Sequence, residues 1–407
     1  MPLSGRLPIP EEVLRIARKL EEAGFETWCV GGAVRDNLLG QPNTDFDLTT
    51  AARPEEVQRL FRRTVPVGVE HGTVAVLDRE NRPHEVTTFR LDVTTDGRHA
   101  QVAFGVSLDQ DLARRDFTIN AIAYHPLRHE WRDRFGGDAD LQRKLIRAVG
   151  DPAQRFREDY LRILRALRFA ARFDFAIDPA TWEAARASIA GLKRLSAERV
   201  RDEWFKGLRS AQRPSELVTL WDEVGALSLW MPEVSRELYA GRGTRPTAHS
   251  AQRTMLDALP PDPVLITSYL SADPAATLTR LRCSNAEIER GRRIAAYRDT
   301  WPDPGSDASI RRWLAAVGPA AGDLLALARA RGEAEELIAA VDRVRAAQPP
   351  LTLGDLAVSG DDLIAAGVPR GPAIGETLRT LLDLVLEDPS LNNTPALLAK
   401  VARRGKV

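Results

Sequence analysis

The chain has 407 residues, 43% of them hydrophobic, and its 57 basic and 57 acidic side chains cancel to a net charge of zero. This composition excludes a chain that is disordered throughout and a uniformly basic coat, and the length predicts about two to four domains. With only Cys29 and Cys283, a disulfide framework and a cysteine zinc cluster are excluded. No apolar run approaches the roughly 18 residues of a membrane span, and the N-terminus lacks the apolar core of a signal peptide, so we expect a cytoplasmic protein without a membrane partner.

Up to about residue 135 the sequence predicts a mixed α/β domain. Apolar residues recur with helical spacing over 11–22, 53–61 and 108–115. Short apolar or alternating runs predict strands over 27–30, 65–69, 73–77 and 85–89, and the last three are expected to form one meander. The polar segment 94–100 is expected to be a flexible loop.

From about residue 150 onward almost the whole chain is predicted to be helical. Helices are expected over 155–173, 179–190 and 197–208. Weaker helical patterns continue to the end, with breaks near 231–247, 259–263, 301–308 and 348–354. The expected fold class is therefore α+β, with a small mixed domain followed by a long helical region.

A pair of glycines, Gly31 and Gly32, follows the predicted strand at 27–30 and opens a predicted helix with the sequence GGAVRD. Glycine lets the backbone approach a phosphate, and the free N–H groups of a helix N-terminus favour anions. Arg35 would lie one turn into the helix, within reach of phosphate oxygens. The pattern indicates a nucleotide phosphate site, although such a turn alone is more often purely structural.

Asp45 and Asp47 form an Asp-Phe-Asp sequence shortly afterwards. Residues i and i+2 of a strand point to the same side, so a cation between the two carboxylates would offset their repulsion. Such oxygen ligands suit Mg²⁺, and two ions could activate a hydroxyl and stabilise a leaving pyrophosphate. Glu85 would complete this cluster if its strand is a neighbour, or would face water if it lies on an edge strand. For the two aspartates alone, a solvated loop is the alternative.

The sequence RRDFTINA follows the predicted helix at 108–115 and supplies further polar groups. Arg115 is expected to bind the triphosphate, with Asp116 orienting it. Asn120 is expected to hydrogen-bond a sugar hydroxyl or to cap a turn. Taken alone, adjacent arginines are more often a solvated face.

Together, GGAVRDNLLG…DFD, RRDFTINAIAY and FREDYLRILRALRFAARF, in this order, resemble the class II tRNA nucleotidyltransferase and bacterial poly(A) polymerase family. The resemblance covers about residues 25–210, most closely that of a bacterial CCA-adding enzyme. It implies a polymerase-β-like head over 1–140 and a base-recognising neck over 141–210, then a helical body over 211–300 and a tRNA-binding tail over 301–407. It also implies CTP and ATP as substrates, Mg²⁺ as cofactor and a tRNA 3′ end as acceptor.

Position by position, the resemblance assigns metal binding to Asp45 and Asp47, with Glu85 as the possible third carboxylate. It assigns nucleotide contacts to Gly32, Arg35, Arg115, Arg165 and Arg168. It assigns base recognition to Asp159 and Arg162 of the E-D-x-x-R motif. Arg168 is expected to meet a phosphate or an acid elsewhere, and Glu198, Arg199 and Glu203 are expected to brace the neck helix.

Base recognition has a physical rationale. If Asp159 and Arg162 lie at i and i+3 of one helix, their side chains are neighbours, one accepting and one donating hydrogen bonds. Cytosine and adenine present an amino donor beside a ring-nitrogen acceptor and fit this pair. Guanine and uracil present the reverse, and each mismatch costs about 1–3 kcal/mol. The alternative is an ordinary ion pair within a helix.

Other functions remain open at this stage. An enzyme that adds only CC or only A is possible because segment 91–100, which matches a loop that governs the change from C to A, ends in Ala100 where proline is usual. A poly(A) polymerase, a non-catalytic RNA-binding scaffold and a small-molecule nucleotidyltransferase are further alternatives. A C-terminal His-Asp phosphohydrolase activity is not expected, because His249 is the only histidine in the C-terminal half.

Overall fold

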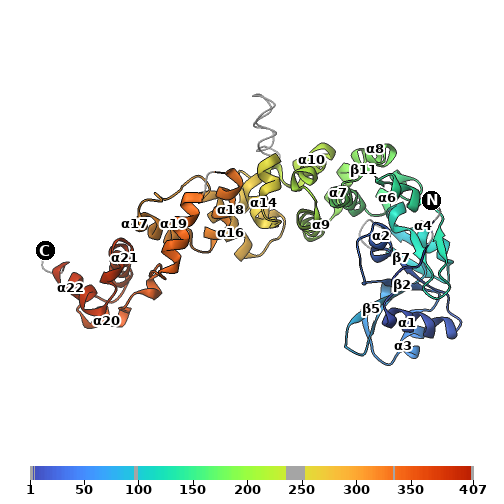
Figure 1. Cartoon of the computed structure of the whole chain (residues 1–407), viewed down its shortest axis with the longest axis horizontal. Helices are drawn as coiled ribbons and strands as arrows, with labels where there is room; N and C mark the ends of the chain where they lie inside the picture. The colour runs from blue at the N-terminus through green and yellow to red at the C-terminus, as the bar shows by residue number, and fades with distance from the viewer. Residues whose placement is uncertain (1–2, 4, 96–99, 235–252, 333–334, 405–407) are drawn as a thin grey trace. The chain divides into compact units, whose positions relative to one another are not determined.

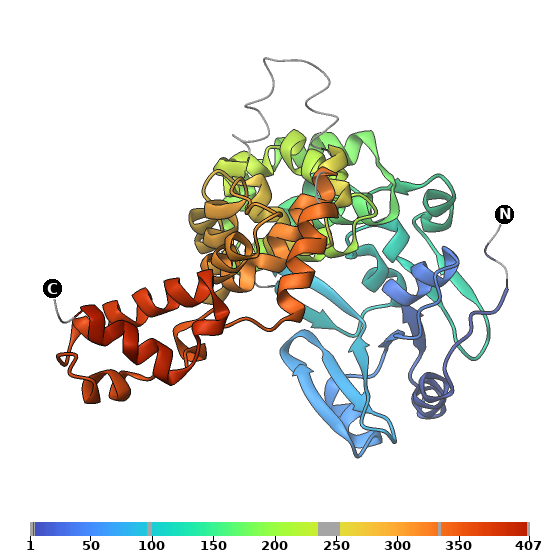
Figure 2. The same cartoon turned by 60° about the vertical axis from the view of Figure 1, so that its left-hand side comes forward.

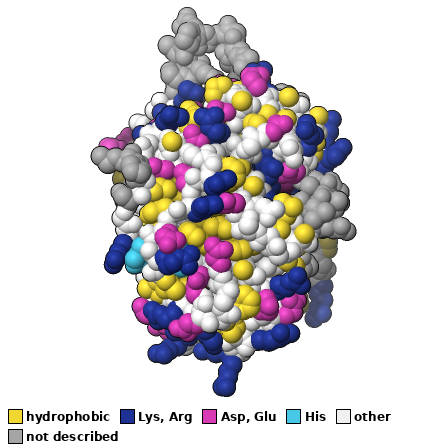
Figure 3. Space-filling model, turned by 90° about the vertical axis from the view of Figure 1, so that its right-hand side faces the viewer, with side chains coloured by type: hydrophobic (Ala, Val, Ile, Leu, Met, Phe, Trp, Pro, Cys, Tyr) yellow, Lys and Arg dark blue, Asp and Glu magenta, His cyan; other side chains and the backbone are white. Residues whose placement is uncertain are grey.

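A computed structural model describes residues 3, 5–95, 100–234, 253–332 and 335–404 of the chain (Figures 1 and 2). The chain divides into two compact units, Met1–Pro232 and Glu233–Val407. No helix in the described ranges is long and apolar enough to cross a membrane. On the face drawn in Figure 3, basic and acidic side chains are interspersed with apolar ones, consistent with a net charge of zero.

Unit 1 begins with a seven-stranded mixed sheet of strand order β3-β4-β5-β2-β1-β8-β9. Its strands are β1 (Thr27–Val30), β2 (Asp47–Thr50), β3 (Thr64–Gly68), β4 (Thr73–Leu77), β5 (Pro83–Thr88), β8 (Ile122–Tyr124) and β9 (Trp131–Asp133). The expected meander is confirmed, since β3, β4 and β5 pair antiparallel in succession. Only β2 and β5 pair in parallel within this sheet, with Leu48 opposite Val86. This pairing sets the residues just before Leu48 and Val86 side by side.

The central strand β1 is buried on both faces, as its continuous apolar sequence requires. Trp28 and Val30 pack with Leu112 on one face, whereas Cys29 packs with Leu48 on the other. The helices of the mixed domain are α1 (Glu11–Glu22), α2 (Gly32–Leu38), α3 (Pro54–Leu60), α4 (Leu108–Ala113) and α5 (Gly137–Gln142). The apolar stripe of α1 contributes Ile16 and Leu20 to the Cys29 side, and α4 covers the opposite side. The sheet therefore holds the ends of β2, β5 and α4 in fixed relation.

The segment expected to be a loop over 94–100 is in part a hairpin. Strands β6 (Arg90–Thr95) and β7 (Ala100–Phe104) pair antiparallel in a separate two-stranded sheet. The loop expectation is wrong at both flanks, because these polar residues satisfy their backbone groups by pairing across the hairpin. Residues 96–99 lie outside the described residues, whereas Ala100, which stands where proline is usual, begins β7.

Apart from two short strands, the rest of unit 1 is mainly helical, as predicted. Its helices are α6 (Pro152–Glu158), α7 (Leu161–Phe173), α8 (Pro179–Ala187), α9 (Ala197–Ser210), α10 (Pro214–Val224) and α11 (Ala226–Trp230). Short strands β10 (Leu145–Ile146) and β11 (Ala176–Ile177) pair in parallel. The α7 side chains Phe169 and Phe173 belong to the same buried cluster as the α1 stripe. The base-recognition segment is thus packed directly onto the mixed domain.

The described residues of unit 2 form helices joined by turns and loops, with no strand among them. Its helices are α14 (Pro263–Leu270), α15 (Pro274–Arg280), α16 (Asn285–Tyr297), α17 (Asp307–Val317), α18 (Ala321–Arg331), α19 (Glu335–Ala346), α20 (Gly360–Ala365), α21 (Pro372–Glu387) and α22 (Thr394–Arg404). The last three share a small core with Leu363, Leu381 and Leu397 at its centre (Figure 2). His249 lies outside the described residues.

Candidate active site

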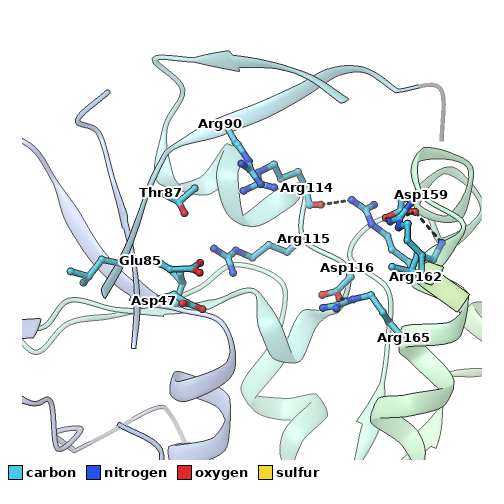
Figure 4. Close-up of a pocket in the computed structure, with 14 residues that line it drawn as sticks. Asp47, Glu85, Thr87, Arg90, Arg114, Arg115, Asp116, Asp159, Arg162 and Arg165 are labelled. Atoms are coloured by element: carbon cyan, nitrogen blue, oxygen red, sulfur yellow. Dashed lines mark hydrogen bonds and ion pairs between the residues drawn. The ribbon is translucent and has the colours of Figure 1, made fainter. Parts of the chain in front are cut away.

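A cavity of about 470 Å³ opens in unit 1 where the sheet, the end of α4 and the start of α7 meet (Figure 4). The sheet contributes Asp47, Glu85 and Thr87. The segment after α4 contributes Arg114, Arg115 and Asp116, and the neck contributes Asp159, Arg162, Arg165 and Arg199. Acids on one side thus face arginines on the other, which suits a ligand that carries both cations and phosphates.

The acidic side of the cavity is built by the parallel strands β2 and β5, which bring Asp47 beside Glu85. Partial loss of hydration, together with the charges of Glu85 and Asp45, raises the pKa of Asp47 to about 6. The expectation that Glu85 lies on a neighbouring strand is confirmed. The crowding of like charges shows that a cation bound here would relieve repulsion.

Asp45 is placed differently from expectation. Strand β2 begins at Asp47, so Asp45 lies in the preceding segment rather than on the same strand face, and it is exposed. Its backbone N–H donates to Asn43 Oδ1 at 2.9 Å, which fixes this turn. Within the described ranges, no group of at least three histidine, cysteine or acidic side chains forms a ready-made metal site. The carboxylates are therefore neighbours but not a closed ligand cage.

Gly31 lies where the acids and arginines approach each other. Its φ of +77° favours glycine, and a Cβ there would be 3.4 Å from Asp47 Oδ2 and 3.6 Å from Arg115 Nη1. The next residue, Gly32, begins α2. The glycine pair thus brings bare backbone to the boundary between the two charged sides.

Arg35 does not line the cavity. Its side chain is buried, donates to Asp36 Oδ1 from Nε at 2.8 Å and donates from Nη1 to Asn120 Oδ1. Its guanidinium also lies over the rings of Phe169 and Phe173. The structure therefore corrects the expected phosphate contact. Arg35 lies one turn into α2, where its side chain points into the protein and joins the mixed domain to α7.

Asn120 and Asp116 also belong to a buried network. Asn120 Nδ2 donates to Asp116 Oδ1 at 2.9 Å, so both ends of the Asn120 amide are used inside the protein rather than by a sugar. Asp116 pairs with Arg165 at 2.8 Å. Burial alone would raise the pKa of Asp116, but the Arg165 charge and the hydrogen bonds from Asn120 and Arg165 lower it to about 2.

The sequence had suggested that Asp116 orients Arg115, and this expectation is wrong. That role falls to Asp111, whose carboxylate is fully buried and lies 3.3 Å from Arg115 Nη2 and 2.8 Å from Arg114 Nη2. Asp111 was not among the residues predicted from the sequence. The i,i+3 and i,i+4 spacing of an acid before two arginines on a predicted helix was the available signal.

The helix predicted over 155–173 is interrupted at the base-recognition motif. Asp159 is extended (φ −152°, ψ 106°) and ends α6, and its Oδ1 accepts the N–H of Leu161 at 3.0 Å at the start of α7. The ring of Tyr160 packs directly against Gly191. A Cβ at position 191 would lie only 2.0 Å from Cε1 of that ring. The expected i,i+3 pair on one helix is therefore wrong, although Asp159 and Arg162 line the same cavity.

Each base-recognition side chain has its own bracing partner. Asp159 Oδ2 accepts a hydrogen bond from Arg199 Nη2 at 2.9 Å. Arg162 donates to Glu158 at 2.8 Å and to the backbone oxygen of Arg114 at 3.0 Å (Figure 4). Separate partners thus brace the two side chains, which line the same cavity.

Arg165 and Arg168 separate, as the spacing along the helix predicted. Arg165 lines the cavity, whereas Arg168 turns to Glu203 of α9, 2.6 Å away, and both Arg168 and Glu203 are buried. The predicted bracing by Arg199 and Glu203 is seen in these contacts.

Replacing Glu203 with glutamine is expected to lower the free energy of unfolding by about 3 kcal/mol, because Arg168 would be left buried without its counter-ion. Urea denaturation measures this effect. The exposed pair Arg213–Asp174, 2.9 Å apart, provides the control: Asp174→Asn should change stability by less than about 1 kcal/mol. Equal effects of the two substitutions would contradict the bracing role.

Comparison with known proteins agrees with this geometry. Residues 27–147 match the family described as the poly A polymerase head domain, and residues 174–238 match one described as a probable RNA and SrmB-binding site of polymerase A. The CCA-adding enzyme of Levilactobacillus brevis is 36% identical over 415 residues, covering 97% of this chain and 98% of the relative. The CCA-adding enzyme of Streptococcus mutans is 34% identical over 407 residues, covering 95% and 96%.

A crystal structure of the Bacillus stearothermophilus CCA-adding enzyme in complex with CTP has a TM-score of 0.83 to this chain at 30% identity, covering 98% of each. The mixed sheet, the paired acids and the helical region that follows define a nucleotidyltransferase of class II. The two near full-length relatives named above are both CCA-adding enzymes. The chain belongs to the CCA-adding enzyme family.

Proposed function

We propose that the cavity of unit 1 is the single site at which this chain adds C, C and A to the 3′ end of tRNA, using CTP and ATP and releasing pyrophosphate. CCA addition is the activity of the family to which the chain belongs. The observation that supports this site is the arrangement of Asp47 and Glu85 opposite Arg115, with Asp159 and Arg162 in the same lining. Family membership also favours full CCA addition over partial addition or poly(A) synthesis.

The acids of this site fit a divalent cation, which we propose to be Mg²⁺. Asp47, Glu85 and Asp45 would hold it, because they are oxygen donors, and burial together with the charges of Glu85 and Asp45 raises the pKa of Asp47. When bound, such an ion lowers the pKa of an attacking hydroxyl and offsets charge on the leaving pyrophosphate. Arg115 would bind triphosphate oxygens opposite the acids.

The base would be read by protein groups instead of a template. Asp159 Oδ2 accepts one hydrogen bond from Arg199, and a carboxylate oxygen can accept another from the amino group of cytosine or adenine. Arg162 would donate to the neighbouring ring nitrogen. Uracil and guanine would place a carbonyl against Asp159, which costs about 1–3 kcal/mol for each unmatched group. Asp159 and Arg162 are therefore not a pair on one helix, as expected from the sequence, but they still offer one hydrogen-bond acceptor and one donor to the base.

The raised pKa of Asp47 predicts how activity depends on pH. As the pH falls through about 6, Asp47 takes up a proton and loses affinity for the cation, so activity at limiting Mg²⁺ should decline. Raising the Mg²⁺ concentration should move the midpoint to lower pH, because protons and metal compete for one carboxylate. Initial rates of CMP incorporation at two Mg²⁺ concentrations measure this shift, and a midpoint independent of Mg²⁺ would contradict it.

We propose that the division into head, neck, body and tail holds, and that the tail in unit 2 binds tRNA through phosphate contacts. The exposed side chains Arg370 and Arg379 are candidates. Replacing both with glutamate should weaken tRNA binding by about tenfold or more and reduce the salt dependence of binding, while CTP binding stays unchanged. Filter binding at several salt concentrations tests this. Unchanged tRNA affinity would place the tRNA contacts elsewhere.

Since tRNA is made in the cytoplasm, we propose that the protein acts in the cytoplasm.

Nucleotide incorporation into tRNA transcripts tests the function directly. Transcripts ending before CCA, after C and after CC are incubated with Mg²⁺ and with CTP, ATP, both, or GTP plus UTP, and their 3′ ends are sequenced. Addition of CCA to the shortest transcript, stopping there, is expected. In the reaction with both CTP and ATP, products ending in CC, products with A alone, or long A tails would each contradict the proposal and indicate the corresponding alternative enzyme. An Asp45→Ala, Asp47→Ala protein is the blank.

A further inference from the structure

The last turn of α4 contains a buried carboxylate that the assigned chemistry does not use. Asp111 has no exposed surface, and it accepts hydrogen bonds from Arg114 Nε at 3.0 Å and Nη2 at 2.8 Å. Its other oxygen accepts from Arg115 Nη2 and, at 3.5 Å, from the hydroxyl of Thr49 on β2. One carboxylate therefore holds two adjacent arginines of the cavity and ties them to the sheet.

Arg115 lies between two sets of acids. Asp111 holds it from behind, while in front a Cβ on Gly31 would lie 3.6 Å from Arg115 Nη1 and 3.4 Å from Asp47 Oδ2, so Arg115 and Asp47 approach each other beside Gly31. Arg115 Nε is buried and has no hydrogen-bond partner within the described part of the chain. If Asp111 lost its charge, attraction would draw the guanidinium toward Asp47 and Glu85. Asp111 thus keeps the Arg115 guanidinium in place and keeps it from neutralising Asp47 and Glu85.

The same turn is contacted from the base-recognition side. Arg162 Nη2 donates to the backbone oxygen of Arg114 at 3.0 Å, and Arg155 Nη1 donates to that of Ala113 at 3.2 Å. Cations at the C-terminus of a helix satisfy carbonyl groups that have no partner within the helix. Residues 113–115 therefore connect a side chain that reads the base to the side chain that faces the acids.

We propose that Asp111 is a positioning residue for nucleotide transfer, which fixes Arg115 at the triphosphate side and prevents its collapse onto Asp47. This inference rests on the proposed function of the cavity. It predicts that Asp111 acts through Arg115, not through the stability of the domain.

The test is Asp111→Asn, with Asp140→Asn as the matched control. Asp140 is also buried in unit 1 and binds an arginine, Arg147 at 3.1 Å, and a threonine, Thr118 at 2.7 Å, but it does not line the cavity. Asp111→Asn should lower the single-turnover rate of CMP incorporation by about 100-fold, the effect of misplacing a reacting group by roughly 1 Å. The KM for tRNA should stay within about twofold, and Asp140→Asn should stay within about twofold in rate as well.

A double-mutant cycle decides between positioning and general destabilisation. In an Arg115→Ala background, Asp111→Asn should cost less than about threefold, because its effect passes through Arg115. If Asp111→Asn fails to fold, the pair Asp111→Asn, Arg114→Gln removes one charge of each sign and is compared with Arg114→Gln alone. A full effect in the Arg115→Ala background, or a rate equal to that of the control, would overturn the proposal. Failure of the wild-type protein to add nucleotides would instead overturn the proposed function.

Discussion

Asp47→Asn is expected to lower CMP and AMP incorporation by at least about 1,000-fold while leaving the fold intact. The carboxylate is the part of the sheet that faces both Glu85 and Arg115 in the cavity, and it is the donor best placed to hold a divalent cation. Such a cation supplies several kcal/mol of transition-state stabilisation, and about 4 kcal/mol corresponds to this factor. The amide cannot replace the lost charge.

The same substitution should not destabilise the protein. Because the pKa of Asp47 is raised to about 6 in the folded state, its contribution to stability is present at low pH and is lost as the pH rises through 6. At pH 7.5 the charged form therefore opposes folding, and Asp47→Asn should melt at the same temperature as wild type or higher. A side chain that is costly to the fold and necessary for activity is typical of a functional site.

Single-turnover incorporation and thermal unfolding at pH 5 and pH 7.5 measure both effects. The matched control is Asp109→Asn, which removes an acid of the same domain that pairs with Arg132 outside the cavity lining. The control should retain activity within about twofold. A loss of stability at pH 7.5 in Asp47→Asn that parallels its loss of activity would contradict the assignment.

The sequence predicted the mixed domain well because its signals are local. The strand at 27–30 and the helix at 11–22 match β1 and α1 to the residue, since an apolar run and an amphipathic stripe each specify one element. The resemblance of the motifs to the nucleotidyltransferase family implied that Asp47, Arg115, Asp159 and Arg162 belong to one site, and these four side chains line one cavity. Each of these residues lies at or near the end of a helix or strand, where side chains from different elements can meet.

Long-range contacts were beyond the sequence analysis. The break between α6 and α7 has no glycine or proline in the sequence, and it depends on Tyr160 packing against Gly191, a residue far along the chain. Arg35 looked like a phosphate ligand because its neighbours do, yet its burial against Phe169 and Phe173 is decided by the packing of α7. Which acid orients which arginine likewise depends on side-chain geometry, and no local propensity encodes it.

Asp159→Asn is expected to relax the choice of base. At Asp159 a carboxylate only accepts hydrogen bonds, which is why an amino group of cytosine or adenine is favoured there over a carbonyl group. An amide of the same shape both donates and accepts, so it can rotate to meet the carbonyl of uracil. Preference for CTP over UTP should fall by about 10- to 100-fold, which corresponds to 1–3 kcal/mol for one mismatched buried group.

Arg199→Ala separates base reading from simple damage to the site. Arg199 holds both oxygens of Asp159, at 2.9 and 3.1 Å, but does not change which groups a base meets. Its loss should raise the KM for CTP and ATP while UTP remains rejected, because the carboxylate is less well oriented and still only accepts hydrogen bonds. Competition between CTP and UTP on a tRNA lacking CCA, read by sequencing, distinguishes the two variants. If Asp159→Asn rejected UTP as strictly as wild type does, the group that reads the base would have to lie elsewhere in the cavity, with Arg162 as the next side chain to vary.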